Sequence, residues 1–167
     1  ALRLVKKELK DTKIVLSGAG AAGTAIARLL VRSGAVNIIG FDKDGVICKS
    51  TPNLGDEMRT WFIDNCNPTD FRGNISEAMK DADIFIGVSA PNVLTETDVA
   101  SMAPKSIIFA LANPDVGITS CRTLYSNGKR EREIAFLSPW LTIGWLRSIY
   151  KLAFSIKIAK KFPQGRL

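Results

Sequence analysis

Short apolar runs and longer stretches with helical spacing alternate along the first two-thirds of the chain. Four runs rich in β-branched and aromatic residues, each bounded by polar or turn-forming residues, predict buried strands: 12–16, 36–41, 83–88 and 106–111. Between them, apolar residues at helical spacing predict helices over about 24–33, 57–66, 75–80 and 95–102. Strands that alternate with helices in this way are typical of an α/β fold with a mostly parallel sheet.

Local signals add detail at three places. Thr95 is followed three residues later by Asp98, which predicts a capping box with Asp in place of the usual Glu. Residues 2–9 predict an amphipathic helix with a basic face. Asp81 and Asp83 lie between a predicted helix and the next strand, and we expect both carboxylates to be solvated.

Three glycines stand where the first predicted strand is followed by the first helix, in Ser17-Gly18-Ala19-Gly20-Ala21-Ala22-Gly23. Gly18 permits the tight turn, Gly20 lets the backbone approach a pyrophosphate, and Gly23 lets the helix pack against its strand. The N–H groups of the first helical turn and the helix dipole favour phosphate there. Ala21 and Ala22 leave that approach free of large side chains. The alternative is a glycine-rich turn that binds nothing, which the strand–turn–helix context disfavours.

A carboxylate follows the second predicted strand. Asp42 stands nineteen positions after Gly23, where an acidic residue can accept hydrogen bonds from an adenosine ribose and repel a 2′-phosphate. The pattern favours NAD over NADP, although the neighbouring Lys43 weakens the exclusion of the phosphate. Strand, glycine loop, helix and acidic residue together predict a Rossmann-like, doubly wound, mostly parallel sheet.

The net charge of +7 is unevenly distributed. Up to Asp115, 13 Lys and Arg stand against 14 Asp and Glu, whereas from Val116 onward 10 stand against 2. All the excess basic charge therefore lies in the last third of the chain. This distribution is not that of a uniformly basic nucleic-acid-binding protein, and we expect no nucleic-acid partner.

Cysteine and histidine usage limits the possible chemistry. The three cysteines, Cys48, Cys66 and Cys121, form no close pair, and the chain has no histidine. Neither a disulfide framework nor a zinc site follows from this pattern, and the commonest general base is missing. No apolar run approaches the ~18 residues of a membrane-spanning helix. We expect a reduced, cytoplasmic setting.

Four motifs in order resemble the cofactor domain of malic enzyme, most closely its short prokaryotic type. They are the glycine loop, Phe41-Asp42-Lys43-Asp44-Gly45, Asp83-Ile84-Phe85-Ile86-Gly87-Val88-Ser89-Ala90-Pro91 and Ile108-Phe109-Ala110-Leu111-Ala112-Asn113-Pro114. That family converts L-malate to pyruvate and CO2 with reduction of NAD or NADP, using Mg²⁺ or Mn²⁺. The resemblance covers about two-thirds of the chain and stops after Asp115. Since the family presents a further strand beyond this point, the resemblance implies a sheet that is incomplete at its C-terminal edge.

The resemblance implies a cofactor-binding role for ten residues: Gly18, Gly20, Ala21, Ala22, Gly23, Asp42, Val88, Ser89, Ala90 and Asn113. The loop residues would hold the pyrophosphate, and Asp42 the adenosine ribose. Residues 88–90 would line the nicotinamide side, and Asn113 would offer its amide where the nicotinamide ribose meets malate. The alternatives are that Ser89 merely ends a strand and that Asn113 only precedes the turn at Pro114.

The same resemblance implies that catalytic parts are missing. In the family, the Tyr and Lys that transfer protons and the carboxylates that bind the metal lie in a preceding domain, and nothing here matches those motifs. We therefore expect no catalytic residue and no metal ligand in this chain, dinucleotide binding without turnover, and use of L-malate only with that domain. Homo-oligomers are expected of a full-length enzyme. The alternatives are a non-catalytic NAD-binding module and an interaction or membrane-surface protein driven by the basic tail.

The sequence divides into a dinucleotide-binding domain over 1–115 and a basic tail over 116–167. Around 140–162, basic and small polar residues fall on one helical face and apolar residues on the rest, which predicts an amphipathic helix. Such a helix could lie on an anionic membrane, but packing against the domain or a loosely ordered tail is the expected outcome. The break within a motif and the change in charge near Val116 favour a frameshifted reading of the gene, with a genuinely divergent tail as the alternative.

Overall fold

The computed structural model describes residues 1–52, 55–90 and 93–111. Its strands are β1 (Lys13–Ser17), β2 (Asn37–Asp42), β3 (Gly45–Val46), β4 (Ile84–Gly87) and β5 (Ile107–Ala110). Its helices are α1 (Leu2–Val5), a 3-10 turn over Leu9–Asp11, α2 (Ala21–Arg32), α3 (Glu57–Asn65), α4 (Ile75–Met79) and α5 (Glu96–Ser101). All four predicted strands and the four predicted helices after residue 23 are present, each with bounds a few residues from the expected ones.

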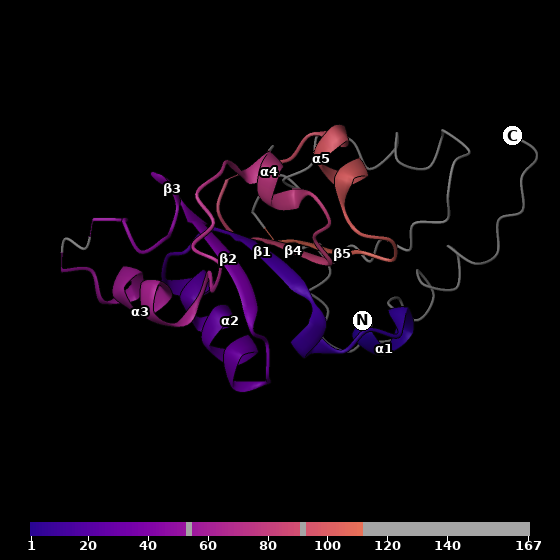
Figure 1. Cartoon of the computed structure of the whole chain (residues 1–167), viewed down its shortest axis with the longest axis horizontal. Helices are drawn as coiled ribbons and strands as arrows, with labels where there is room; N and C mark the ends of the chain where they lie inside the picture. Colours follow the sequence, from indigo (N-terminus) through magenta and orange to yellow (C-terminus); the bar gives the residue numbers. More distant parts are fainter. Residues whose placement is uncertain (53–54, 91–92, 112–167) are drawn as a thin grey trace, which may run out of the picture.

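The strands form one sheet in the order β3-β2-β1-β4-β5 (Figure 1). β1 pairs in parallel with β2 on one side and with β4 on the other, and β4 pairs in parallel with β5. Among the strands of the described residues, only the short β3, which the sequence did not predict, runs antiparallel to its neighbour β2. The order reverses direction on either side of β1, as in a doubly wound sheet. The predicted Rossmann-like, mostly parallel sheet is confirmed.

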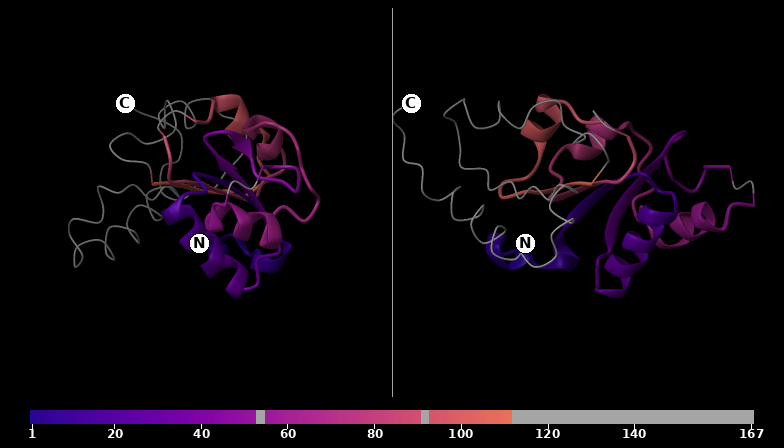
Figure 2. Two further views of the ribbon diagram at one scale, coloured as in Figure 1. Left: turned by 90° about the vertical axis from the view of Figure 1, so that its left-hand side faces the viewer. Right: turned by 180° about the vertical axis from the view of Figure 1, so that it is seen from behind.

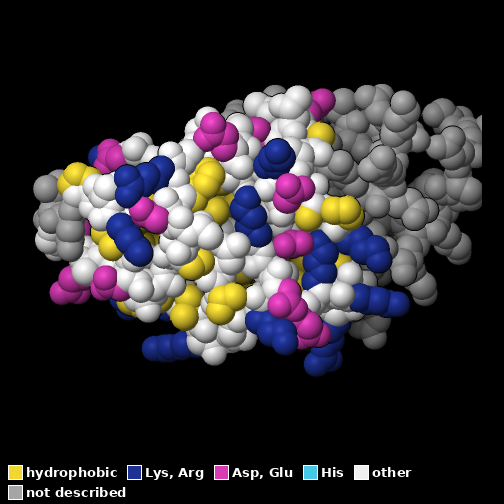
Figure 3. Space-filling view, in the orientation of Figure 1, with side chains coloured by type: hydrophobic (Ala, Val, Ile, Leu, Met, Phe, Trp, Pro, Cys, Tyr) yellow, Lys and Arg dark blue, Asp and Glu magenta, His cyan; other side chains and the backbone are white. Residues whose placement is uncertain are grey.

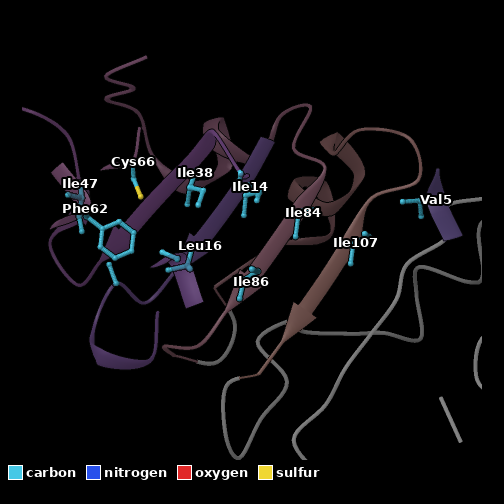
Figure 4. Packing of buried hydrophobic residues seen from close by; sticks show 13 residues of the cluster. Val5, Ile14, Leu16, Ile38, Ile47, Phe62, Cys66, Ile84, Ile86 and Ile107 are labelled. Carbon is cyan, nitrogen blue, oxygen red and sulfur yellow. The ribbon is translucent and has the colours of Figure 1, made fainter. Parts of the chain in front are cut away.

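Helices cover both faces of the sheet (Figures 1 and 2). Because neighbouring residues of a strand point to opposite faces, Leu16 packs with α2 and α3, whereas Val15 packs with α4 and α5. Figure 4 shows the first of these clusters, in which isoleucines of β1, β2, β4 and β5 lie on one face of the sheet and Phe62 lies at its β2 side. Two buried faces explain why the strands are apolar throughout rather than alternating.

The contact between α3 and β2 is unusually close. The Phe62 side chain is fully buried, and a Cβ added at Gly40 would lie 2.7 Å from its Cε1. A side chain at Gly40 would therefore push α3 away from β2. Glycine at position 40 therefore allows α3 to pack directly on β2, which brings the first turn of α3 to the end of that strand.

Capping residues fix the short helices. Asn74 and Glu77 form a capping box at α4, and the predicted box of Thr95 and Asp98 is present at α5. Burial alone would raise the pKa of Asp98. Hydrogen bonds from the Thr95 N–H and from the hydroxyls of Ser76 and Thr95 outweigh burial and hold the pKa of Asp98 below its ordinary value.

Two expectations are wrong, one on the helix at the N-terminus and one on the solvation of Asp83. The predicted helix over 2–9 ends at Val5, because Lys6 adopts a left-handed conformation with φ 55°. The chain then turns so that Lys7 Nζ pairs with Asp83 Oδ1 and donates to the Pro104 carbonyl. Asp83 Oδ2 also accepts the Lys13 N–H at 2.9 Å, so this carboxylate joins the N-terminal segment, β1 and β4 rather than facing water. Asp81 is exposed, as expected.

The domain boundary at residue 115, the basic tail over 116–167 and its helix around 140–162 lie outside the described residues, as does the segment beyond β5. Within the described part of the chain, no helix has both the length and the apolar character needed to cross a membrane.

Asp83→Ala should destabilise the chain by about 1–3 kcal/mol, because it leaves the Lys13 N–H and the Lys7 ammonium without their shared acceptor. Denaturant unfolding monitored by circular dichroism measures this change. Asp81→Asn provides the matched control, since Asp81 is exposed, has φ 56°, and Asn tolerates that conformation. Equal stability losses for the two variants would contradict the structural role of Asp83.

Candidate functional site

The glycine loop joins the end of β1 to the start of α2. Gly18 has φ +109°, which an L side chain rarely adopts, and the N–H groups of Gly18 and Ala19 donate to the Phe41 carbonyl at 2.8 and 2.9 Å. These bonds fasten the loop to the end of β2. Helix α2 begins at Ala21 with Gly20 as its N-cap, so no side chain caps its first-turn N–H groups. Those donors remain available to an anion.

The three glycines differ in what surrounds them. A Cβ at Gly23 would lie 1.9 Å from the Gly18 carbonyl oxygen, and one at Gly18 would lie 2.9 Å from Ser89 Cβ. Both positions are closed by packing within the protein. A Cβ at Gly20 would meet nothing within 4 Å. Gly20 therefore borders open space directly at the start of α2.

Residues 88–90 follow β4 and lie beside this loop. The Val88 N–H donates to the Ser17 carbonyl at 2.9 Å, and the hydroxyls of Ser17 and Ser89 are 2.9 Å apart. Ser89 and Ala90 are exposed, whereas Val88 is half-buried. The sheet therefore brings two of the sequence-predicted segments together at the carboxyl ends of β1 and β4, where the strand order reverses. In open α/β sheets this is where ligands bind.

Asp42 ends β2 on the other side of the loop. It directly follows Phe41, whose carbonyl holds the Ala19 N–H next to Gly20, so Asp42 and Gly20 lie at the same edge of the sheet. Asp42 Oδ1 accepts the Asp44 N–H at 2.7 Å. Nine of the ten candidate residues are described and lie on the glycine loop, on β2 and after β4. The tenth, Asn113, lies outside the described residues.

Arg59 is a member of this site that the sequence analysis did not identify. Its Nη2 donates to Asp42 Oδ2 at 2.5 Å and to Asp44 Oδ2 at 2.9 Å, and the Arg59 side chain is only 14 % exposed. Hydrogen bonds from Arg59 first, and from Lys43 second, hold the pKa of Asp44 below its usual range. Arg59 lies seventeen residues from Asp42 in sequence, so no local pattern links the two.

One signal could have indicated Arg59. Asp56 caps α3 by accepting the N–H groups of Met58 and Arg59, which places Arg59 in the first turn of that helix. A cation there is disfavoured by the helix dipole unless carboxylates compensate it. Asp42 and Asp44 provide that compensation.

One groove lies apart from this edge. A groove between α2 and α3 is lined by Arg28, Val31, Arg32, Trp61 and Asn65, with the Arg28 guanidinium 5.3 Å from the Trp61 ring centroid. It is built on the C-terminal half of α2, away from the glycine loop.

Among the described residues, no group of three or more His, Cys, Asp or Glu is arranged to hold a metal ion. Basic and acidic side chains are interspersed over the face in Figure 3.

Comparisons with known proteins point to one family. The family model described as "Malic enzyme, NAD binding domain" matches residues 1–123. The NAD-dependent malic enzyme of Geobacillus stearothermophilus is 43% identical over 116 residues, which are 68% of this chain and 24% of that protein. The NADP-dependent malic enzyme of Salmonella typhimurium is 40% identical over 117 residues, 68% of this chain and 15% of that protein.

Solved structures give the same result. The crystal structure of the NAD-dependent malic enzyme of Thermotoga maritima aligns with a TM-score of 0.66 and 35% identity, covering 70% of this chain and 31% of that one. The chain thus spans about a quarter of the length of its first curated relative and about a third of this structural neighbour. The matched residues contain the glycine loop, Asp42 and β4, and on this evidence the chain belongs to the malic enzyme family, as an NAD-binding domain.

Proposed function

We propose that this chain binds a nicotinamide dinucleotide, with NAD favoured, and serves as the cofactor domain of an enzyme that oxidises and decarboxylates L-malate. The observation that supports this most directly is the open space at Gly20. Uncapped helix N–H groups border that space, and the Phe41 carbonyl places Asp42 beside it. Relatives named for NAD and for NADP both occur, so their names do not decide between the cofactors.

Each part of the site has a role in this proposal. The backbone from Gly18 to Gly23 holds the pyrophosphate against the N-terminus of α2, where N–H groups and helix dipole favour negative charge. Asp42 accepts hydrogen bonds from the adenosine ribose. Residues 88–90 line the nicotinamide side, because they follow β4 next to the loop. Asn113 provides an amide toward the nicotinamide ribose and malate.

Turnover requires groups beyond these. When bound, the nicotinamide supplies the hydride acceptor, and this chain's residues position it. Hydride transfer also needs malate held at reacting distance, and decarboxylation needs proton transfer. We assign the proton-transferring Tyr and Lys, and the carboxylates for Mg²⁺ or Mn²⁺, to the remainder of a full-length enzyme. We expect full-length forms to be homo-oligomers.

Gly20→Ala should weaken NAD binding by at least about tenfold, because its methyl group occupies the space proposed for the pyrophosphate. The stability loss should stay below about 1 kcal/mol, since Gly20 has φ −81° and its Cβ meets nothing within 4 Å. Isothermal titration calorimetry and thermal unfolding measure the two effects.

Gly23→Ala is the contrasting variant. Its Cβ collides with the Gly18 carbonyl, so this variant should lose stability whether or not NAD is present. Unchanged NAD affinity in a folded Gly20→Ala chain would refute the proposed pyrophosphate site.

Malate-dependent NADH formation should be absent with this chain alone and appear when the N-terminal part of a relative, such as the Geobacillus stearothermophilus enzyme, is added. Absorbance at the NADH band follows the reaction. The Asp42→Ala chain in the same mixture is the control and should restore much less activity. Saturable NAD binding without restored activity would favour a non-catalytic module. Absence of NAD binding would leave only a role based on the basic tail.

A further inference from the structure

A groove on the surface of the domain lies between α2 and α3, away from the glycine loop. The two helices lie side by side on one face of the sheet (Figures 1 and 2). The groove is lined by side chains from the C-terminal half of α2 and from α3: Arg28, Val31, Arg32, Trp61 and Asn65. Its volume of about 270 Å³ lies below the ~300–1,000 Å³ of most small-molecule pockets, which favours a segment of a macromolecule as its occupant.

An aromatic ring and a guanidinium are already stacked in this groove. The Trp61 ring lies edge-on to the fully buried Phe62, with ring centroids 5.5 Å apart and an interplanar angle of 84°. The Arg28 guanidinium lies 5.3 Å from the Trp61 ring centroid. A guanidinium stacked on a ring keeps its in-plane N–H donors available to a carboxylate. Because both side chains are held in place beforehand, binding there costs less conformational entropy.

The two arginines of the groove have no carboxylate partner among the described residues. Arg59 and Arg72 each pair with an aspartate, whereas Arg28 and Arg32 take part in none of the ion pairs of the described part of the chain. Helix α2 itself contains no acidic residue. Since Arg28 and Arg32 are four residues apart, their side chains are neighbours on the helix surface. Two unpaired positive charges beside an aromatic ring are complementary to a segment that carries carboxylates.

Exposed apolar side chains lie next to the groove. Among the described side chains, the large aliphatic ones that are exposed are Leu29 and Val36, at 65% and 62%. Leu29 directly follows Arg28 on α2, and Val36 lies four residues beyond the end of that helix at Arg32. Both therefore lie at the end of α2 that forms the groove. Exposed apolar side chains beside Trp and Arg are typical of a protein–protein interface.

We propose that the α2–α3 groove is a docking surface for an acidic, amphipathic segment of another protein. Carboxylates one helical turn apart in that segment pair with Arg28 and Arg32, and an apolar side chain between them packs against Trp61. The tail of this chain lacks that chemistry, because residues 116–167 carry 10 Lys and Arg against 2 Asp and Glu. Docking does not depend on dinucleotide binding, since the groove lies apart from the glycine loop.

Two labelled peptides test this proposal with the full chain. Both are alanine-based helices of about 16 residues with a leucine on one face. One carries two glutamates a helical turn apart on that face, and the other carries glutamines in their place. Fluorescence anisotropy at low salt should show that the glutamate peptide binds about tenfold more tightly, the combined effect of two surface ion pairs. The preference should shrink at high salt, because salt screens exposed charges.

Variants of the chain locate the binding surface. Arg28→Gln combined with Arg32→Gln should remove the preference for the glutamate peptide. Arg28→Lys should keep only part of it, since an ammonium lacks the planar guanidinium that stacks on Trp61. Arg3→Gln combined with Lys10→Gln is the matched control, because it removes two charges from exposed residues near the N-terminus and should leave the preference unchanged. Circular dichroism checks that each variant is folded.

Four results would overturn the proposal. The first is equal binding, or no binding, of the two peptides, and the second is an equal loss in the control variant. The third is competition by free glutarate as effective as by the glutamate peptide, which would indicate a site for small anions. The fourth is self-association of the chain, seen by sedimentation velocity and abolished by Arg28→Gln, which would assign the groove to a second copy.

Discussion

The Phe41 carbonyl is the acceptor on which the geometry of the candidate site depends. It takes the N–H groups of both Gly18 and Ala19, and so joins the loop after β1 to the end of β2. One residue beyond each partner stand Asp42 on the strand and Gly20 on the loop. A carboxylate and an open helix N-terminus are thus brought side by side by two backbone hydrogen bonds. The loop requires residues without a side chain at two positions, because a Cβ at Gly18 or Gly23 would collide with neighbouring atoms.

Much of the fold could be predicted because its signals are local. Each strand is a short apolar run, the strand–glycine–helix order fixes the loop, and Thr95 with Asp98 caps α5 within four residues. The family resemblance agrees with the family model, the curated relatives and the solved structures. The assignment of individual cofactor-binding residues remains a prediction, although nine of the ten lie at one edge of the sheet.

The features that the sequence did not predict depend on distant partners. Residues 2–9 have helical periodicity, but the turn at Lys6 brings Lys7 to Asp83, seventy-six residues away in the chain. The same contact explains why Asp83 is not solvated. Arg59 meets Asp42 because α3 packs at the end of β2, where Phe62 lies against Gly40. Strand β3 has two residues, which is too short for any periodicity to appear.

The contacts of Asp83 lie far from the candidate site along the strands. Asp83 secures the amino-terminal ends of β1 and β4, whereas the glycine loop, Asp42 and Ser89 all occupy the opposite, carboxyl-terminal ends. The contacts of Asp83 and the candidate site therefore lie at opposite ends of the strands. Substitutions around Asp83 are therefore expected to change stability without changing the shape of the candidate site, because distant sites contribute independently. The stability of the domain and binding at the candidate site are therefore expected to respond to different sets of substitutions.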